Sequence, residues 1–315
     1  MAKALRTDTK ASEVRYHTPV LLQEVLKYLS PKPGDLVIDA TIGGGGHAFE
    51  LLKYGAKVLG IDRDPEAIEH VKDQWKMENV EDPERSRRGN LKLIRGNFSS
   101  IGQIARSNGF DQVSGVLFDL GVSSHQIEKP ERGFSFQKEG PLDMRMDPNL
   151  TVKAGDIINN FDKRRLNEIF KTYGQERHSW PISKAIVSAR QIKPIETTTE
   201  LVQIIEGAVG GVSKYGGRVV KIHPATKAFQ ALRIVVNSEL LNLEETLPQT
   251  VELLKKGGRL ATISFHSLED GIVKRFFKRD ARLKVLTKKP IGPSHQEVSQ
   301  NPRARSAKLR VAERI

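Results

Sequence analysis

Residues 36–47 read LVIDATIGGGGH, an apolar run that ends in four consecutive glycines before a histidine. The apolar part, over residues 36–41, predicts a strand buried on both faces, as in a parallel sheet. The glycines have no Cβ, so the backbone there can approach a ligand closely. Asp62 lies nineteen residues after Gly43, at the end of a second predicted strand over residues 57–62. A carboxylate in that place is suited to accept hydrogen bonds from both hydroxyls of a ribose, so this stretch predicts a sheet that binds a nucleoside-containing cofactor.

The rest of the N-terminal half continues the alternation of strand and helix. Helices are predicted over residues 20–29, 47–54 and 65–76, and strands over residues 91–95 and 115–119. Residues 77–90 are polar and are interrupted by Pro83 and Gly89, which is typical of a surface loop. This order predicts an α/β fold with a doubly wound parallel sheet.

The alternation stops after residue 119 and resumes only with an apolar strand predicted over residues 259–265. Two helices are predicted just before that strand, over residues 225–246 and 248–256. The stretch between is free of strand patterns and contains helical patches at 153–160, 162–172, 178–192 and 197–207, then a basic glycine-rich loop, GGVSKYGG (210–217). A crossover connection needs far fewer residues. We therefore expect an inserted small helical domain that overhangs the carboxyl ends of the strands, where ligands bind in such folds.

The composition narrows the class of protein. A chain of 315 residues is long enough for about two domains, and 38% hydrophobic with 28% charged residues is typical of globular proteins. The chain has no cysteine, which excludes disulfides, thiolate-bound zinc, iron–sulfur clusters and thiol nucleophiles. No stretch approaches the roughly 18 apolar residues of a membrane helix, and the first residues lack the apolar core of a secretion signal. We expect a cytoplasmic protein without membrane contact.

The charge is concentrated near the C-terminus. The formal net charge is +13, and residues 274–314 contain thirteen Lys and Arg against three acidic residues. Such a field is the electrostatic signature of nucleic-acid binding, which we favour over a merely solubilising tail. Four residues within this segment are expected to contact RNA phosphates: Arg303, Arg305, Lys308 and Arg310.

Two cofactors fit the glycine turn, a dinucleotide and S-adenosylmethionine. A strict dinucleotide motif needs glycine where the chain has Ala48 or Phe49, and because alanine is tolerated an NAD-dependent oxidoreductase stays open. Asp119 ends the fourth predicted strand, and methyl-transfer folds place a polar residue there beside the donor methyl group, which favours S-adenosylmethionine. A third hypothesis is an RNA-binding protein without catalysis, and the intact cofactor motifs argue against it.

Motifs of two other enzyme classes are missing. Methyltransferases that act on the amino groups of bases carry a polar-Pro-Pro-aromatic motif after this strand, whereas residues 120–122 are Leu-Gly-Val. His266, Ser267, Glu269 and Asp270 together suggest parts of a hydrolase triad, but the chain has no G-x-S-x-G elbow. We therefore discount a hydrolase.

Eight motifs together resemble one family. They are YHTPV (16–20), DATIGGGGH (39–47), DLGVSSHQ (119–126), RGFSF (132–136), PLDMRMD (141–147), HPATKAFQALRIVVNSEL (223–240), ISFHSLED (263–270) and NPRARSAKLRVAE (301–313). From about residue 14 to the end, the chain resembles the bacterial small-subunit ribosomal RNA methyltransferase H family. That family methylates N4 of a cytidine (cytosine 1402) in the decoding centre of 16S ribosomal RNA.

The resemblance implies a class I, Rossmann-like S-adenosylmethionine-dependent methyltransferase fold with an inserted small helical domain. It implies a discontinuous methyltransferase domain, residues 14–127 and 223–315, and an inserted domain for RNA recognition, residues 128–222. The partner that the resemblance implies is 16S ribosomal RNA or the small ribosomal subunit. The sequence does not indicate the oligomeric state.

The resemblance also assigns residues. Asp62 matches the ribose ligand of the family, and Phe98 matches a residue that lines the adenine pocket. The complete set of expected cofactor contacts is Gly45, Gly46, His47, Asp62, Phe98, Asp119 and Gln126. The exocyclic amine of cytosine is a weak nucleophile, so methyl transfer needs alignment and an acceptor for the amino protons. Asp119 and Ser123 are the candidates for that acceptor by position, and we assign no metal.

Overall fold

The computed structural model describes residues 19–81, 90–210 and 223–315. Its seven strands form one sheet in the order β3-β2-β1-β4-β5-β7-β6. The bounds are β1 (Leu36–Asp39), β2 (Lys57–Asp62), β3 (Asn90–Arg95), β4 (Val113–Asp119), β5 (Leu254–Ser264), β6 (Leu283–Val285) and β7 (Lys308–Arg314). Strands β1 to β5 run parallel, and β7 is antiparallel to both of its neighbours. The predicted α/β sheet is confirmed, with the strand order of a class I methyltransferase fold.

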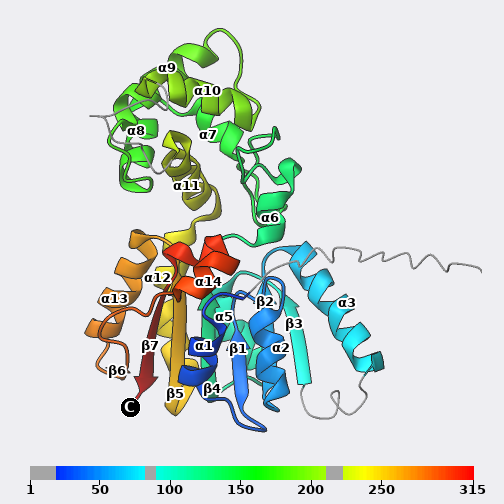
Figure 1. Cartoon of the computed structure of the whole chain (residues 1–315). Helices are drawn as coiled ribbons and strands as arrows, with labels where there is room; N and C mark the ends of the chain where they lie inside the picture. Colours follow the sequence, from blue (N-terminus) through cyan, green and yellow to red (C-terminus); the bar gives the residue numbers. More distant parts are fainter. Residues whose placement is uncertain (1–18, 82–89, 211–222) are drawn as a thin grey trace, which may run out of the picture.

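Helices cover both faces of this sheet (Figure 1). One face packs against α1 (Leu22–Leu29), α2 (Gly46–Lys53) and α3 (Pro65–Glu81), and the other against α5 (Ile101–Ser107), α12 (Glu239–Leu253) and α13 (Ser267–Arg279). Successive residues of β4 alternate between the two cores: Val116 and Phe118 face one, and Leu117 faces the other. The strands are buried on both sides, which explains why their sequences are continuous apolar runs.

A helical unit stands beyond the carboxyl ends of the parallel strands (Figure 1). It contains α7 (Ala154–Asn160), α8 (Lys163–Thr172), α9 (Ser179–Arg190), α10 (Thr198–Val209) and α11 (Pro224–Asn237). These helices share a hydrophobic core of their own. The chain reaches the unit from β4 through α6 (Ser124–Glu128) and the short 3-10 helix η2 (Pro130–Arg132). The four helical patches predicted between strands are therefore confirmed, each within one or two residues.

Shorter elements complete the chain. They are the 3-10 helices η1 (Phe98–Ser100) and η3 (Pro302–Ser306) and the helix α14 (His295–Gln300). Two predicted loops, residues 82–89 of the charged stretch and nearly all of GGVSKYGG, lie outside the described residues. The helix predicted to end at residue 76 continues to Glu81, so the first part of the expected loop is helical. No helix within the described ranges is long and apolar enough to cross a membrane.

The predicted break between two helices at residue 247, just before Pro248, is wrong. The break lies at Ser238, whose backbone is left-handed (φ 50°) and separates α11 from α12. Pro248 lies inside α12, where a proline costs about 3 kcal/mol because it removes a backbone hydrogen bond. Leu243, Leu247 and Val251 keep one face of α12 buried in the core of the sheet on both sides of the proline. This packing outweighs the local preference.

The packing also bears on where the inserted unit ends. The expected boundary after residue 222 separates α11 from the helical unit. Ala228, Phe229 and Leu232 of α11 are nevertheless buried in the core that the helical unit forms. We propose that the inserted unit extends through Asn237 and that the sheet resumes with α12.

Two deletion variants test this boundary. Removal of residues 134–236 with a short Gly/Ser linker should leave a folded sheet unit, because both cores of the sheet stay complete. Removal of residues 130–220 should instead give an aggregating protein, because the apolar face of α11 loses its partners. Soluble yield and cooperative thermal unfolding distinguish the two. Equal behaviour of both variants would contradict the proposed boundary.

Candidate functional site

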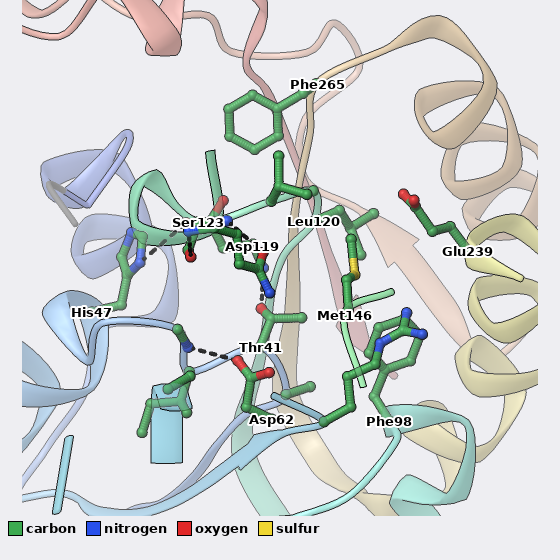
Figure 2. Close-up of a pocket in the computed structure, with 18 of the residues that line it drawn as sticks. Thr41, His47, Asp62, Phe98, Asp119, Leu120, Ser123, Met146, Glu239 and Phe265 are labelled. Carbon is green, nitrogen blue, oxygen red and sulfur yellow. Dashed lines mark hydrogen bonds and ion pairs between the residues drawn. The ribbon is translucent and has the colours of Figure 1, made fainter. Parts of the chain in front are cut away.

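A pocket lies at the carboxyl ends of β1, β2, β4 and β5 (Figure 2). One end is lined by the glycine turn, Asp62 and Phe98, and the other by Phe265, Glu239 and Glu269. The middle is formed by the segment after β4, from Asp119 to Ser123, and by Gln126 and Met146. The location agrees with the rule that ligands of open α/β sheets bind beyond the carboxyl ends of the strands.

The glycine turn holds Asp62 in place. The N–H of Gly43 donates to Asp62 Oδ2 at 2.9 Å, and the N–H of Asp64 donates to Oδ1 at 2.9 Å. Burial raises the pKa of Asp62 despite these hydrogen bonds. Gly45 has a φ of +79°, and a Cβ there would lie 2.6 Å from the ring of Phe49, so only glycine fits. Gly46 lines the pocket, whereas Gly45 lies outside the lining and shapes the turn.

Three acidic residues end adjacent parallel strands. Asp39, Asp62 and Asp119 are the last residues of β1, β2 and β4. The pKa of Asp39 is raised to about 7, mainly by burial and also by the nearby charges of Asp119 and Asp62, against the hydrogen bond from the N–H of Thr41. Like charges held together out of water favour a cation in the pocket next to them.

Asp119 is held from two sides. Its N–H donates to the hydroxyl oxygen of Thr41 at 2.6 Å, and its Oδ2 lies 3.7 Å from Nδ1 of His47. His47 is buried, and its Nε2 lies 3.0 Å from the carbonyl oxygen of Val20. The carbonyl accepts a hydrogen bond, so Nε2 carries the proton and Nδ1 faces the carboxylate. Figure 2 shows His47 and Asp119 on the same wall of the pocket.

The pocket has an aromatic wall at Phe98, the first residue of η1, which follows β3. The ring of Phe98 packs edge to face on Phe118, with the centroids 5.7 Å apart. The guanidinium of Arg63 lies 6.0 Å from the Phe98 centroid and donates to the carbonyl oxygen of Asn237 at 3.0 Å. Arg63 lines the pocket but was not among the predicted site residues, although it directly follows Asp62 in the sequence.

Gln126 and Ser123 form a capping box at the start of α6. Ser123 Oγ accepts the N–H of Gln126 at 3.2 Å, and Gln126 Oε1 accepts the N–H of Ser123 at 3.0 Å. The Gln126 amide also donates to Asp64 at 2.7 Å, and Arg132 donates to the same carboxylate oxygen at 2.8 Å. Ser123 and Gln126 both line the pocket. Both ends of the Gln126 amide are therefore engaged within the protein, which fixes the loop after β4.

The far end of the pocket was missed by the sequence analysis. Glu239 and Glu269 are buried there, and each is bound to a cationic or imidazole partner. Arg233 binds both oxygens of Glu239, at 2.8 and 2.9 Å, and Nε2 of His266 lies 3.1 Å from Oε1 of Glu269. Donor atoms of Glu239, His266 and Glu269 lie within 4.8 Å of one another, a spacing compatible with a metal ion. Because Arg233 occupies both Glu239 oxygens, we interpret the group as an ion-pair network and assign no metal.

A signal for this end was present in the sequence. Glu269 belongs to ISFHSLED, which follows the last parallel strand directly, at the edge of the sheet where the ligand was expected. Glu239 could not be predicted in this way, because its position in the pocket depends on the chain break at Ser238 that separates α11 from α12.

The basic C-terminal residues do not all face solvent. Arg310 is buried (6% exposed) and binds Asp270 through two hydrogen bonds, at 2.6 and 3.2 Å, so the expected phosphate contact of Arg310 is wrong. Its position within β7, between β5 and β6, explains this, since the consecutive residues 309–312 of β7 are all buried. Arg303, Arg305 and Lys308 retain accessible side chains, with Arg303 3.2 Å from Glu128 and Lys308 3.9 Å from Asp270.

Comparisons with known proteins agree with this geometry. The MraW methylase family matches residues 14–315. The ribosomal RNA small subunit methyltransferase H of Halothermothrix orenii is 47% identical over 95% of this chain and 98% of its own length. The protein of the same name from Persephonella marina is 48% identical over 95% of this chain and 99% of its own. That from Deinococcus deserti is 45% identical over 99% and 97%.

The match extends over the sheet, the pocket and the helical unit alike, and identities of this size over nearly whole chains imply a common fold. The chain belongs to the MraW methylase family.

Proposed function

We propose that this protein transfers a methyl group from S-adenosylmethionine to N4 of a cytidine in the decoding centre of 16S ribosomal RNA. The observation that carries the proposal is the pocket in which the glycine turn meets the carboxylates of Asp62 and Asp119, with the buried Asp39 at the end of the strand between theirs. Membership of a methylase family supports a methyl donor over a dinucleotide, so an NAD-dependent oxidoreductase is not proposed. The names of the relatives support the small-subunit RNA as substrate.

The residues of the pocket fit this cofactor. Asp62 would accept hydrogen bonds from the ribose hydroxyls, and the ring of Phe98 would cover the adenine. Gly46 and His47 would carry the methionine part along the turn that Gly45 shapes, and Asp119 would bind the methionine amine. Gln126 would act by holding the loop after β4 in place. When bound, the cofactor supplies an electrophilic methyl group on a positively charged sulfur, and the carboxylates beside it favour that charge.

Catalysis then depends on how the protein presents the base. The amine of cytosine donates its lone pair into the ring, so its attack needs in-line alignment at close range. The base also has to leave its stack, at a cost of a few kcal/mol that is lower for unpaired RNA. Asp119 lies at the end of the pocket where it would bind the methionine amine. Ser123 Oγ already accepts a helix N–H. Neither residue is therefore a strong proton acceptor.

The RNA would approach over the carboxyl edge of the sheet. There the inserted helical unit stands beyond the strand ends, and α14, which directly precedes the basic segment of η3, lies at the same edge of the sheet (Figure 1). Arg303, Arg305 and Lys308 lie close together in the sequence and are accessible. We infer that the substrate is held between these two surfaces, with the helical unit serving RNA recognition.

Replacing Asp62 tests the cofactor placement. Asp62→Ala should weaken S-adenosylmethionine binding tenfold or more, because two ribose hydroxyls lose a charged acceptor worth roughly 1.5–3 kcal/mol for each hydrogen bond. Glu69→Gln, on an exposed face of α3, is the control and should leave the affinity unchanged. Isothermal titration calorimetry measures both. Unchanged affinity in Asp62→Ala would remove the ribose from this position.

Cofactor affinity should depend on pH through Asp39. Below pH 7 this buried carboxyl is protonated in the free protein, because its pKa is raised to about 7. A bound cation favours the ionised form, so affinity should rise as the pH increases through 7. Asp39→Asn keeps an acceptor for the N–H of Thr41 and should flatten this rise. Titrations with S-adenosylmethionine at several pH values between 6 and 8.5 test this. An equally steep rise of affinity with pH in Asp39→Asn would contradict the assignment of the pH dependence to Asp39.

Salt dependence tests the basic surface. Replacing Arg303, Arg305 and Lys308 together by Gln should make the slope of log affinity against log salt shallower by up to about 2, at about 0.7 for each contact with single-stranded RNA. Arg310→Gln is the contrasting variant, because it breaks a buried ion pair and should lower thermal stability rather than the slope. Filter binding over a salt series measures the slopes. A triple variant with the wild-type slope would show that these residues do not meet phosphates.

A further inference from the structure

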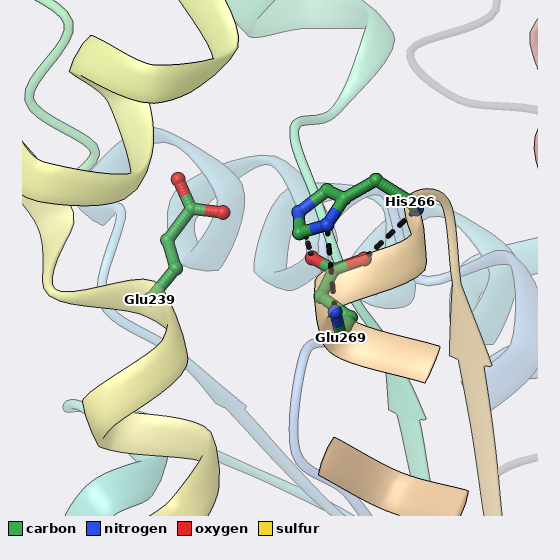
Figure 3. A group of neighbouring side chains, drawn as sticks. All are labelled: Glu239, His266 and Glu269. Carbon is green, nitrogen blue, oxygen red and sulfur yellow. Dashed lines mark hydrogen bonds and ion pairs between the residues drawn. The ribbon is translucent and has the colours of Figure 1, made fainter. Parts of the chain in front are cut away.

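Glu269 stands out among the pocket residues that the proposed function leaves without a role. It is only 2% exposed and lies at the third position of the capping box that begins α13, directly after β5. Its carboxylate lines the same pocket as Asp62 and Asp119, at the opposite end from Asp62. Figure 3 shows the carboxylate of Glu269 under the His266 ring, with Glu239 across from both.

The contacts of Glu269 leave it one free acceptor position. Oε2 accepts the N–H of Phe265 at 2.9 Å and the N–H of His266 at 3.3 Å. Oε1 lies 3.1 Å from Nε2 of His266. An ionised carboxylate offers about four acceptor positions. Two are used by N–H groups, both on Oε2, and the ion-pair contact with His266 takes at most one on Oε1, so at least one is left. The carboxylate is thus held rigidly but can still accept one hydrogen bond from a ligand in the pocket.

Glu239 differs from Glu269 in its cationic partner. Arg233 clamps both of its oxygens through a bidentate ion pair. Such a pair neutralises the carboxylate and fixes its geometry. Of the two buried glutamates at this end of the pocket, Glu269 is the one without a bidentate arginine, so it is the better proton acceptor.

The surroundings suit a flat, polar ligand. Phe265 precedes the capping box, donates its N–H to Glu269 and lines the same pocket. Figure 2 shows its ring close to Leu120. Extruded bases are bound by stacking on such side chains and by hydrogen bonds to their Watson–Crick edge. A carboxylate accepts hydrogen bonds only, so it favours an amino group and disfavours a carbonyl.

We propose that Glu269 recognises the exocyclic amino group of the target base and takes up its proton during methyl transfer. This inference rests on the proposed function and names the acceptor that Asp119 and Ser123 do not provide. In the step, the amino nitrogen forms a bond to the methyl carbon as the carbon–sulfur bond breaks. The nitrogen then carries the positive charge that was on sulfur, and one of its protons passes to Glu269, which leaves a neutral methylated amine and a protonated carboxyl.

The acidity of Glu269 agrees with this role. Burial alone would raise its pKa, but the hydrogen bond and charge of His266, the charge of Arg233 and the N–H of Phe265 hold the pKa below its ordinary value. The carboxylate is therefore ionised and ready to accept at neutral pH. A methylated amine that has lost its conjugation with the ring is a strong acid, so even a weakly basic carboxylate can accept its proton.

The first experiment measures binding rather than turnover. Short decoding-centre RNAs with cytidine or uridine at the target position are compared in filter binding to the full chain. The wild type should prefer cytidine by about tenfold, because uridine places a carbonyl oxygen against Glu269. Glu269→Gln should reduce the preference to about twofold or less, since an amide can donate as well as accept. A wild type that binds both RNAs equally overturns the proposal, whatever the fate of the variant.

The second experiment measures methyl transfer at saturating RNA and cofactor. Glu269→Gln should lower kcat by about a hundredfold or more, the range of a general base, with S-adenosylmethionine affinity unchanged. Glu269→Asp keeps the carboxylate one methylene further back and should recover part of the rate. Asp270→Asn is the matched control, because it removes the next carboxylate of α13, which binds Arg310 and not the pocket, and should retain the rate.

The outcomes distinguish a failure of the proposed function from a failure of the role of Glu269. A wild type that methylates no small-subunit RNA contradicts the proposed function itself. A wild type that methylates cytidine, with a Glu269→Gln variant within threefold of its kcat, overturns only the role of Glu269. Equal losses in Glu269→Gln and Asp270→Asn, in parallel with their melting temperatures, would assign the effect to stability and also overturn the role.

Discussion

The pocket depends on acidic residues that the parallel sheet forces together. Asp39 lies opposite Leu117 of β4 and Gly60 of β2 in the sheet register, so Asp62 and Asp119 end their strands close beside it. Holding these carboxylates out of water has a cost: burial raises the pKa values of Asp39 and Asp62, and the charges of Asp119 and Asp62 add to the rise at Asp39. The cost is tolerable because Gly43, Thr41 and His47 bind the acids and because a cation would relieve it. The glycine turn, the fixed loop after β4 and the favoured charge of the ligand all follow from this arrangement.

Much of this could be predicted from residues that act locally. Apolar runs buried on both faces gave the strands, and the order of strand, glycine turn and Asp62 indicated the cofactor end of the pocket. The helical patches were found because each buries one stripe against a shared core. Where long-range packing decides, local signals failed: Pro248 lies inside a helix with one buried face, whereas the chain breaks at Ser238. Arg310 likewise has the charge of an RNA ligand but the burial of a core residue.

The two ends of the pocket differ in how they are built, and this explains why one was visible in the sequence. The end near Asp62 consists of contiguous motifs, in which spacing along the chain reports proximity in space. The end near Glu269 brings together Arg233, Glu239 and His266 from the helical unit, α12 and the segment after β5. The sequence alone does not show that these residues lie together, because only the fold brings their segments into contact. A residue pattern that suggested a hydrolase there turned out to be a capping box that aims a carboxylate into the pocket.

Asn237 joins the helical unit to the sheet through both its side chain and its backbone. Its side-chain amide binds the carbonyl oxygen of Met144 and the N–H of Met146, and its own carbonyl oxygen accepts from Arg63 and Asn242. The helical unit and the pocket wall that contains Arg63 are thus joined through Asn237. A helical unit transplanted from a relative to change RNA preference would therefore have to bring a matching partner for Arg63. Without it, the exchange would disturb the cofactor pocket that it was meant to leave alone.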